Sequence, residues 1–283
     1  AAYMTIRDRG FADMLAPYLS SGLLQHWPQH PVKLRSGERP EPLPHKSDSY
    51  TVSGTASSLI KAMLNDHLSD IDMRLASKAV QITHDGEAAK EAKAAWRIVI
   101  EDSTATEDQQ EIIADWVIST APAPQTAALL PLSASFHQQL SNVGTDGCFT
   151  LMLGFDTVLN TGWDAAWGAD DQPIGFISDN RTKPGRDQAR TALTVHAGNS
   201  WSSRHLASDY DDVKAQMIAA LHALTGINAA SASHIGFHRW LYANPSRPLQ
   251  GSEKTPFVMD RSMRLGAAGD WCLGGRIENA YLS

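Results

Sequence analysis

Residues 264–283, RLGAAGDWCLGGRIENAYLS, decide the expected fold. Leu265–Ala268 predicts a short strand that ends at Gly269-Asp270, and a glycine-containing loop then leads to a helix beginning near Gly275 or Arg276. Glycines let the backbone approach a flat ligand closely, and a helix start offers free N–H groups and partial positive charge. The Asp270 carboxylate can accept hydrogen bonds from hydroxyl groups. A plain strand–loop–helix connection is the alternative reading, because Gly-Asp turns are common.

The same stretch resembles the second flavin-binding motif of FAD-dependent amine oxidases. That motif has a Gly-Asp, a short loop, a basic or small residue, an aliphatic residue, Glu, Gly and Ala. Residues 276–280 match it except at Asn279, where the family usually has Gly. The resemblance implies that Gly269 and Asp270 lie at the ribityl or pyrophosphate part of FAD. It also implies that the backbone around Arg276, Ile277 and Glu278 donates to the flavin pyrimidine.

Other segments resemble the same family in chain order, so the resemblance covers nearly the whole chain. It implies that the Val80 backbone holds the adenine end of FAD, and that the strand and proline turn through Thr120 and Pro122 pass near the cofactor. Four passages are similar to the renalase-like branch in particular, namely 183–186, 195–197, 201–202 and 238–243. Two departures are Thr55-Ala56, where Gly-Met is usual, and Leu241, where Arg is common.

The renalase-like passages supply the candidate substrate-side residues, which are Trp201, His238, Arg239 and Trp240. Each has a structural alternative. Trp201 and Trp240 are individually more typical of core or rim aromatics. His238 is more typical of a hydrogen-bonded structural histidine, and Arg239 of a partner for a carboxylate. Their order along the chain, together with the flavin motif, favours the functional interpretation.

The expected fold is α/β, with an incomplete FAD/NAD(P)-binding Rossmann-like layer interleaved with a mixed-sheet substrate domain. The FAD-binding part is expected at 46–130 and 262–283, and the substrate domain at 1–45 and 131–261. Periodicity predicts helices over 8–24, 56–68 and 209–224, and apolar strands over 112–119, 148–155 and 234–241. The five prolines of 28–49 predict a surface connector outside the core, and 244–256 reads as a loop.

A dinucleotide-binding flavoenzyme also needs a strand, a Gly-x-Gly-x-x-Gly turn and a helix. No such motif occurs in the sequence. We therefore expect that the chain begins after this unit, and that by itself it binds FAD weakly or not at all. A purified chain that retains stoichiometric flavin would contradict this expectation.

A serine acyltransferase of the β-lactamase type is a competing hypothesis. Ser58 and Lys61 fit Ser-x-x-Lys at a helix start, Ser178-Asp179-Asn180 follows, and Lys254-Thr255 comes later. The third motif fails because Pro256 stands where glycine is required and removes a strand donor. A non-catalytic remnant that only binds a nucleotide is a further alternative.

Composition limits the other classes of function. The net charge of −7 and the scattered Lys and Arg residues argue against nucleic acid as a partner. No apolar run is long enough to span a bilayer, and no signal peptide is visible, so no membrane partner is expected. The two cysteines favour a reduced, cytoplasmic protein. Pro28 separates His26 from His30, and the remaining histidines lack ligand spacing, so no metal is expected.

The resemblance implies an activity. The intact enzyme is expected to transfer a hydride from a dihydronicotinamide dinucleotide or an amine to FAD, and electrons then pass to molecular oxygen to give hydrogen peroxide. The flavin supplies the redox chemistry, and the protein supplies orientation and electrostatics.

Overall fold

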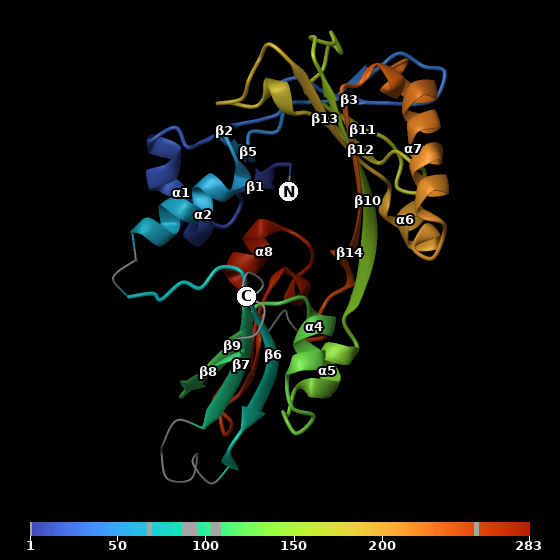
Figure 1. Ribbon diagram of the computed structural model, residues 1–283. Coiled ribbons are helices and arrows are strands. Elements are labelled where there is room, and N and C mark those ends of the chain that lie inside the picture. Colours follow the sequence, from blue (N-terminus) through green and yellow to red (C-terminus); the bar gives the residue numbers. More distant parts are fainter. Residues whose placement is uncertain (1, 67–69, 87–94, 103–108, 252–254) are drawn as a thin grey trace. The chain divides into compact units, whose positions relative to one another are not determined.

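The computed structural model describes residues 2–66, 70–86, 95–102, 109–251 and 255–283, and it is a mixed α/β structure as expected (Figure 1). The chain divides into two compact units. The first unit comprises 1–66 and 145–244, and the second comprises 67–144 and 245–283. These boundaries assign 46–66, 131–144 and 245–261 differently from the expected domains, whose functional roles remain a prediction. Within the described residues, no helix combines the length and hydrophobicity needed to cross a bilayer.

The N-terminal part of the first unit is a small sheet with two helices. Helix α1 (Arg9–Ser20) begins where predicted, because the Asp8 side chain accepts a hydrogen bond from the Phe11 N–H at 2.8 Å. The chain then forms β2 (Leu24–His26) instead of continuing the helix to residue 24. Strand β5 (Ser49–Val52) pairs with both β1 (Met4–Thr5) and β2, and helix α2 (Ala56–Asn65) follows.

A seven-stranded sheet forms the rest of the first unit, in the order β14-β10-β13-β12-β11-β3-β4. Most neighbours are antiparallel, but β11 and β3 run parallel. Its strands are β3 (Pro31–Lys33), β4 (Glu41–Pro42), β10 (Gly144–Phe155), β11 (Ala165–Trp167), β12 (Phe176–Asp179), β13 (Thr191–His196) and β14 (His234–Arg247). The single-turn helices η1 (Asn180–Thr182) and η2 (Ala229–Ser231) lie in its connections.

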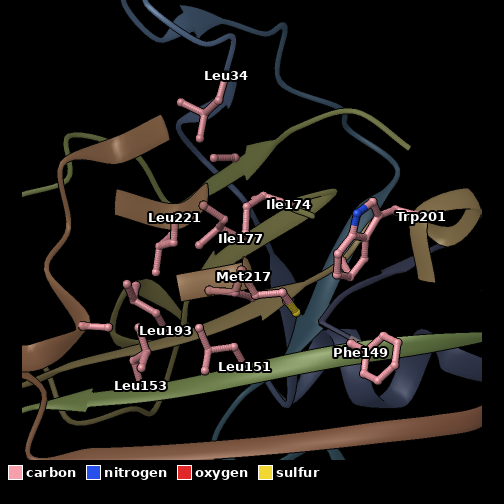
Figure 2. Packing of buried hydrophobic residues seen from close by; sticks show 14 of the residues in the cluster. Leu34, Phe149, Leu151, Leu153, Ile174, Ile177, Leu193, Trp201, Met217 and Leu221 are labelled. Carbon is pink, nitrogen blue, oxygen red and sulfur yellow. The ribbon is translucent and has the colours of Figure 1, made fainter. Parts of the chain in front are cut away.

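One face of this sheet carries the core of the first unit. Phe149, Leu151 and Leu153 alternate along β10 and are buried. They pack with residues of α6 (Asn199–His205) and α7 (Tyr210–Thr225), among them Trp201, Met217 and Leu221, as Figure 2 shows. Helix α7 is confirmed at both ends, by the Asp209 N-cap and the left-handed Gly226.

The predicted connector over 28–49 is wrong in part. Pro31–Lys33 is strand β3 of the large sheet, and Val32 and Leu34 belong to its core. Two further predictions also need correction. Residues 112–119 form two strands, with Asp115 and Trp116 between them, and β14 continues through residues 244–247 of the predicted loop.

The second unit contains two three-stranded sheets. Strands β6 (Ser77–His84), β7 (Trp96–Asp102) and β8 (Gln109–Ala114) form an antiparallel meander. Strands β15 (Val258–Asp260), β16 (Leu265–Ala267) and β9 (Val117–Ser119) form the other sheet. The helices among its described residues are α4 (Ala123–Leu129), α5 (His137–Ser141), the single turn η3 (Asp270–Cys272) and α8 (Ile277–Leu282).

Candidate functional site

Two parallel strands of the second unit bring together the loops that were predicted to hold FAD. Leu265 pairs with Val117 and Ala267 with Ser119, so β16 and β9 end at the same edge. The Ala268 N–H donates to the Ser119 carbonyl at 3.1 Å. This hydrogen bond joins the two segments where they leave the sheet. Ligands of open α/β sheets bind beyond the carboxyl ends of parallel strands. We call the segments that follow, 119–122 and 267–278, the carboxyl-edge loops.

The carboxyl-edge loops are fastened to each other around Gly269. The Trp271 indole N–H donates to the Ala121 carbonyl at 3.1 Å, and the ring lies directly against Gly269. A Cβ atom on Gly269 would come within 2.6 Å of the indole nitrogen. Glycine is therefore needed at residue 269 so that Trp271 can hold the two loops together.

The Asn279 side chain fills the place where the family usually has glycine. Its amide donates to the carbonyls of Leu273 at 3.1 Å and Gly274 at 2.6 Å, and its oxygen accepts from Arg276 at 3.2 Å. Asn279 is buried by these contacts. It is thus accommodated as a brace for the loop before α8.

Charged groups at the carboxyl-edge loops are partly buried. Burial raises the pKa of the Asp270 carboxyl, because the charged form loses hydration. The Glu278 carboxylate is only 2% exposed and pairs with the Arg276 guanidinium at 3.2 Å. Thr120 and Ile277 are exposed, and Pro122 is partly buried. Val80 belongs to a different sheet, on β6 of the meander.

The face of the large sheet opposite its core carries a row of ring side chains. Register places Thr150, His196, Phe176 and Trp167 side by side on β10, β13, β12 and β11. Thr150 Oγ1 and His196 Nδ1 lie 3.0 Å apart, and the rings of Phe176 and His196 stack at 6.1 Å. We call this the aromatic face. Its rings are partly exposed, so a ligand can reach them.

Strand β14 adds two of the predicted substrate-side residues to the aromatic face. A Cβ atom on Gly236 would touch Met152 at 3.2 Å, which places the even-numbered residues of β14 on the same face as Met152 and Thr150. His238 and Trp240 therefore belong to the aromatic face, and their rings contact each other at 4.2 Å. Trp240 is 51% exposed.

The other two predicted substrate-side residues lie on the core side of the sheet. Arg239 donates to the Leu206 carbonyl at 2.8 Å. Trp201 is buried in the core cluster, where its ring stacks on His205 at 4.1 Å. The structure thus brings His238 and Trp240 together and separates Arg239 and Trp201 from them.

A lysine-containing loop borders the aromatic face. Lys183 lies over the indole ring of Trp27, with its Nζ 4.7 Å from the ring centroid. The Trp27 indole N–H donates to Thr182 Oγ1 at 3.0 Å, and the Gly54 backbone N–H donates to the Pro184 carbonyl at 3.0 Å. Gly185 has a φ of 67°, and a Cβ atom there would come within 2.6 Å of Ser53 Oγ. The Lys-Pro-Gly-Arg passage is thus a fixed turn that presents Lys183.

The residues proposed for acyl transfer have local hydrogen-bond partners. Ser58 Oγ lies 2.9 Å from Thr55 Oγ1, and the buried Ser178 hydroxyl donates to Asn180 Oδ1 at 2.9 Å. Lys61 is exposed on α2. Lys254 lies outside the described residues.

Sequence reasoning missed most of the aromatic face as a candidate site. His196 and Lys183 were noted only as parts of family-like passages, and Thr150, Phe176 and Trp167 were not candidates. A period-2 signal was present, because Thr150 and Met152 alternate with apolar core residues on β10. The alternate residues of each strand form the second face of the sheet, and this pattern predicts the residues of the aromatic face.

Comparisons with known proteins agree on a flavoenzyme fold. The most similar solved structures include a protein provisionally assigned as a protoporphyrinogen oxidase from Exiguobacterium sp. 255-15, with a TM-score of 0.57, 16% identity and coverage of 80% of this chain and 48% of the other. Cyclohexylamine oxidase from Brevibacterium oxydans IH-35A follows, with a TM-score of 0.53, 14% identity and coverage of 80% and 49%. Wild-type putrescine oxidase bound to putrescine gives a TM-score of 0.53, 12% identity and the same coverage.

At these identities the likeness concerns the fold, and the chain spans about half the length of each matched structure. The family assignment comes from the sequence. Residues 38–283 match the family described as flavin containing amine oxidoreductase. This match covers most of the chain, including the carboxyl-edge loops and the aromatic face. The chain therefore belongs to the flavin-containing amine oxidoreductase family.

Proposed function

We propose that the natural protein carrying this chain is an FAD-dependent oxidoreductase that oxidises a small electron-rich molecule and passes the electrons to oxygen, giving hydrogen peroxide. One observation carries the proposal. In a chain of a flavin-containing family, the parallel strands β9 and β16 bring residues 119–122 and 267–278 to one sheet edge. This is the edge at which α/β sheets bind nucleotide cofactors.

The carboxyl-edge loops fit a planar, hydroxyl-bearing cofactor. The Asp270 carboxylate can accept hydrogen bonds from ribityl or ribose hydroxyls. Gly274 leaves the backbone open to close approach, and the Trp271 ring packed against Gly269 fixes the position of the loop. Bound FAD would supply the acceptor for a hydride, which no side chain provides. We propose that Thr120, Pro122, Gly269, Asp270, Arg276, Ile277 and Glu278 surround it, with Val80 at the adenine end.

The aromatic face is proposed as the substrate side, with His238 and Trp240 among its residues. Aromatic rings provide large contact area with little loss of conformational entropy, so they orient a flat substrate well. Trp201 and Arg239 would act from the core side of the sheet, by supporting β10 and β14. The renalase-like passages favour a dihydronicotinamide dinucleotide as the substrate, and an amine is the alternative.

The proposal is tested by titrating FAD into the natural protein that carries this chain, with flavin absorbance and fluorescence as readouts. Asp270→Ala should weaken FAD binding about tenfold or more, because it removes a partly buried hydrogen-bond acceptor. Asp115→Ala is the matched control, since Asp115 is an exposed carboxylate that precedes β9 and lies at the opposite edge of the same sheet.

Hydrogen peroxide release is then followed with dihydronicotinamide dinucleotides and with small amines. Peroxide formed from one of these substrates supports the oxidase. Stoichiometric flavin without peroxide from any of them would favour a non-catalytic nucleotide-binding protein. Equal effects of Asp270→Ala and Asp115→Ala on FAD affinity would contradict the cofactor site.

A further inference from the structure

We propose that Lys183 and the aromatic face form a binding site for a planar aromatic anion, and that Lys183 makes this site reject ammonium ligands. The inference rests on the proposed function in taking the aromatic face as the substrate side. It goes beyond that function by naming the charge of the ligand and the residue that selects it.

Within the part of the chain that the structure describes, the Lys183 ammonium contacts the Trp27 ring but has no anionic or hydrogen-bonding partner. Lys183 is only 6% exposed, and among the residues that the structure describes, no hydrogen bond or ion pair reaches its ammonium group. The fully enclosed polar atoms without partners in the described chain are His84 Nε2 and Arg181 Nε, so the Lys183 ammonium keeps contact with solvent. A cation that is largely buried and unpaired is costly, which indicates that a ligand supplies the missing partner.

The surroundings of Lys183 do not neutralise its charge. Burial and the nearby positive charge of Arg186 lower its pKa to about 8. The Asp48 carboxylate, which helps to raise the pKa of the neighbouring Tyr3 after burial, is already paired with Arg7 at 2.7 Å. At pH 7 the Lys183 side chain is therefore still mostly protonated and attracts an anion.

The buried Trp27 ring under Lys183 is connected to the aromatic face through Tyr3. Tyr3 lies between Trp27 and the aromatic face, with ring centroids 6.3 Å from Trp27, 6.1 Å from Trp167 and 6.1 Å from Phe176. The charge of Lys183 also contributes to the lowered pKa of His196, after burial, so the lysine acts on the row itself. The geometry therefore offers the partly exposed rings of Tyr3, Trp167 and Phe176 to a flat ligand, and the positive charge of Lys183 to its charged group.

Charge decides which flat ligand fits. A carboxylate or phosphate would pair with Lys183 and gain a charge-assisted hydrogen bond. An ammonium group would face the like charges of Lys183 and Arg186 in a partly dehydrated place, where repulsion is stronger than in water. Aromatic rings alone would instead favour a cation, so the lysine reverses the preference that the rings would have by themselves.

The test uses three ligands that share one ring and differ in charge, namely benzoate, benzamide and benzylamine. Dissociation constants are measured by ligand-observed NMR titration of the 283-residue chain at pH 7, without turnover. We expect benzoate to bind about tenfold more tightly than benzamide, and benzylamine more weakly than both. Lys183→Met should remove the advantage of benzoate, whereas Lys61→Met, at an exposed lysine of α2, should leave it unchanged.

Phe176→Leu is a second variant that leaves Lys183 in place. It should weaken all three ligands by a similar factor, because it removes ring contact and no charge. The proposal is overturned if benzylamine binds as tightly as benzoate, if no ligand binds, or if folded Lys183→Met keeps the benzoate preference. Because binding is measured without flavin chemistry, these outcomes are independent of whether the protein oxidises any substrate.

Discussion

At the scale of single residues, Lys183 should be a destabilising side chain that is present for binding. Its pKa falls from 10.5 to about 8 in the folded protein, so folding releases a proton between these two pH values. Lys183→Met keeps the length of the side chain and removes the charge. It should stabilise the protein at pH 7 by about 1–3 kcal/mol, an amount bounded by the free-energy equivalent of the pKa shift.

The stabilisation by Lys183→Met should depend on pH. The unfolded chain binds more protons than the folded chain between pH 8 and 10.5, so the penalty from Lys183 is complete below pH 8 and disappears as the pH approaches 10.5. Urea denaturation of the wild type and Lys183→Met at pH 7 and pH 10 should show a difference that shrinks at the higher pH. A variant that is less stable than the wild type at pH 7 would show that Lys183 has a structural partner.

Asn279 supports a second prediction at the residue scale. Asn279→Gly restores the residue that is usual in the family, but it removes two donated hydrogen bonds to the loop at Leu273 and Gly274 and places glycine in α8. We expect a loss of about 2 kcal/mol in stability and weaker FAD binding. Thermal melting and an FAD titration measure the two effects. Tighter FAD binding by Asn279→Gly would show that the side chain obstructs the cofactor.

At the scale of elements, the parallel pair β9 and β16 has two unlike faces. Leu265 is fully buried, whereas Ile118 on the neighbouring strand is 65% exposed. Leu265→Ala should therefore destabilise the second unit by about 3 kcal/mol, and Ile118→Thr should change its stability by less than about 0.5 kcal/mol. Urea denaturation followed by tryptophan fluorescence checks both values. A large effect of Ile118→Thr would mean that this face is covered in solution.

Elements with local signals were predictable from sequence, and those that depend on distant partners were not. Helix α7 follows from its Asp209 cap, its apolar periodicity and Gly226, all within one segment. Strand β3 has only three residues, and it pairs with β11, which is more than a hundred residues away in sequence. The sequence of 28–49 therefore contains no local pattern that predicts a strand. Helix α6 was missed for a similar reason, since its seven residues are stabilised by core packing through Trp201.

The same distinction explains the candidate site. The carboxyl-edge loops were found because residues 264–278 combine a strand, glycines and an acid in one stretch. The pairing of β9 with β16 was not predictable, because it joins segments almost 150 residues apart. Lys183 gave no signal by itself, since its burial depends on Trp27 from the beginning of the chain. Alternation along β14 would have separated Arg239 from His238 and Trp240.

At the scale of the whole molecule, the two proposed sites lie in different compact units. The carboxyl-edge loops belong to the second unit, and the aromatic face with Lys183 belongs to the first. The three hydrophobic clusters formed by the described residues likewise fall within single units, two in the first and one in the second. Binding stabilises the segments that a ligand contacts. Ligands for the two sites should therefore stabilise different segments of the chain.

Hydrogen–deuterium exchange measured by mass spectrometry makes this separation testable. FAD added to the natural protein should slow exchange in residues 117–122 and 265–278, where the backbone amides of the carboxyl-edge loops lie. Benzoate added to the 283-residue chain should slow exchange in 148–152, 176–186 and 194–197, and Lys183→Met should reduce this protection to the level that benzamide gives. If benzoate instead protects 117–122 and 265–278, the planar anion occupies the cofactor site, and the aromatic face loses its assignment as a separate binding surface.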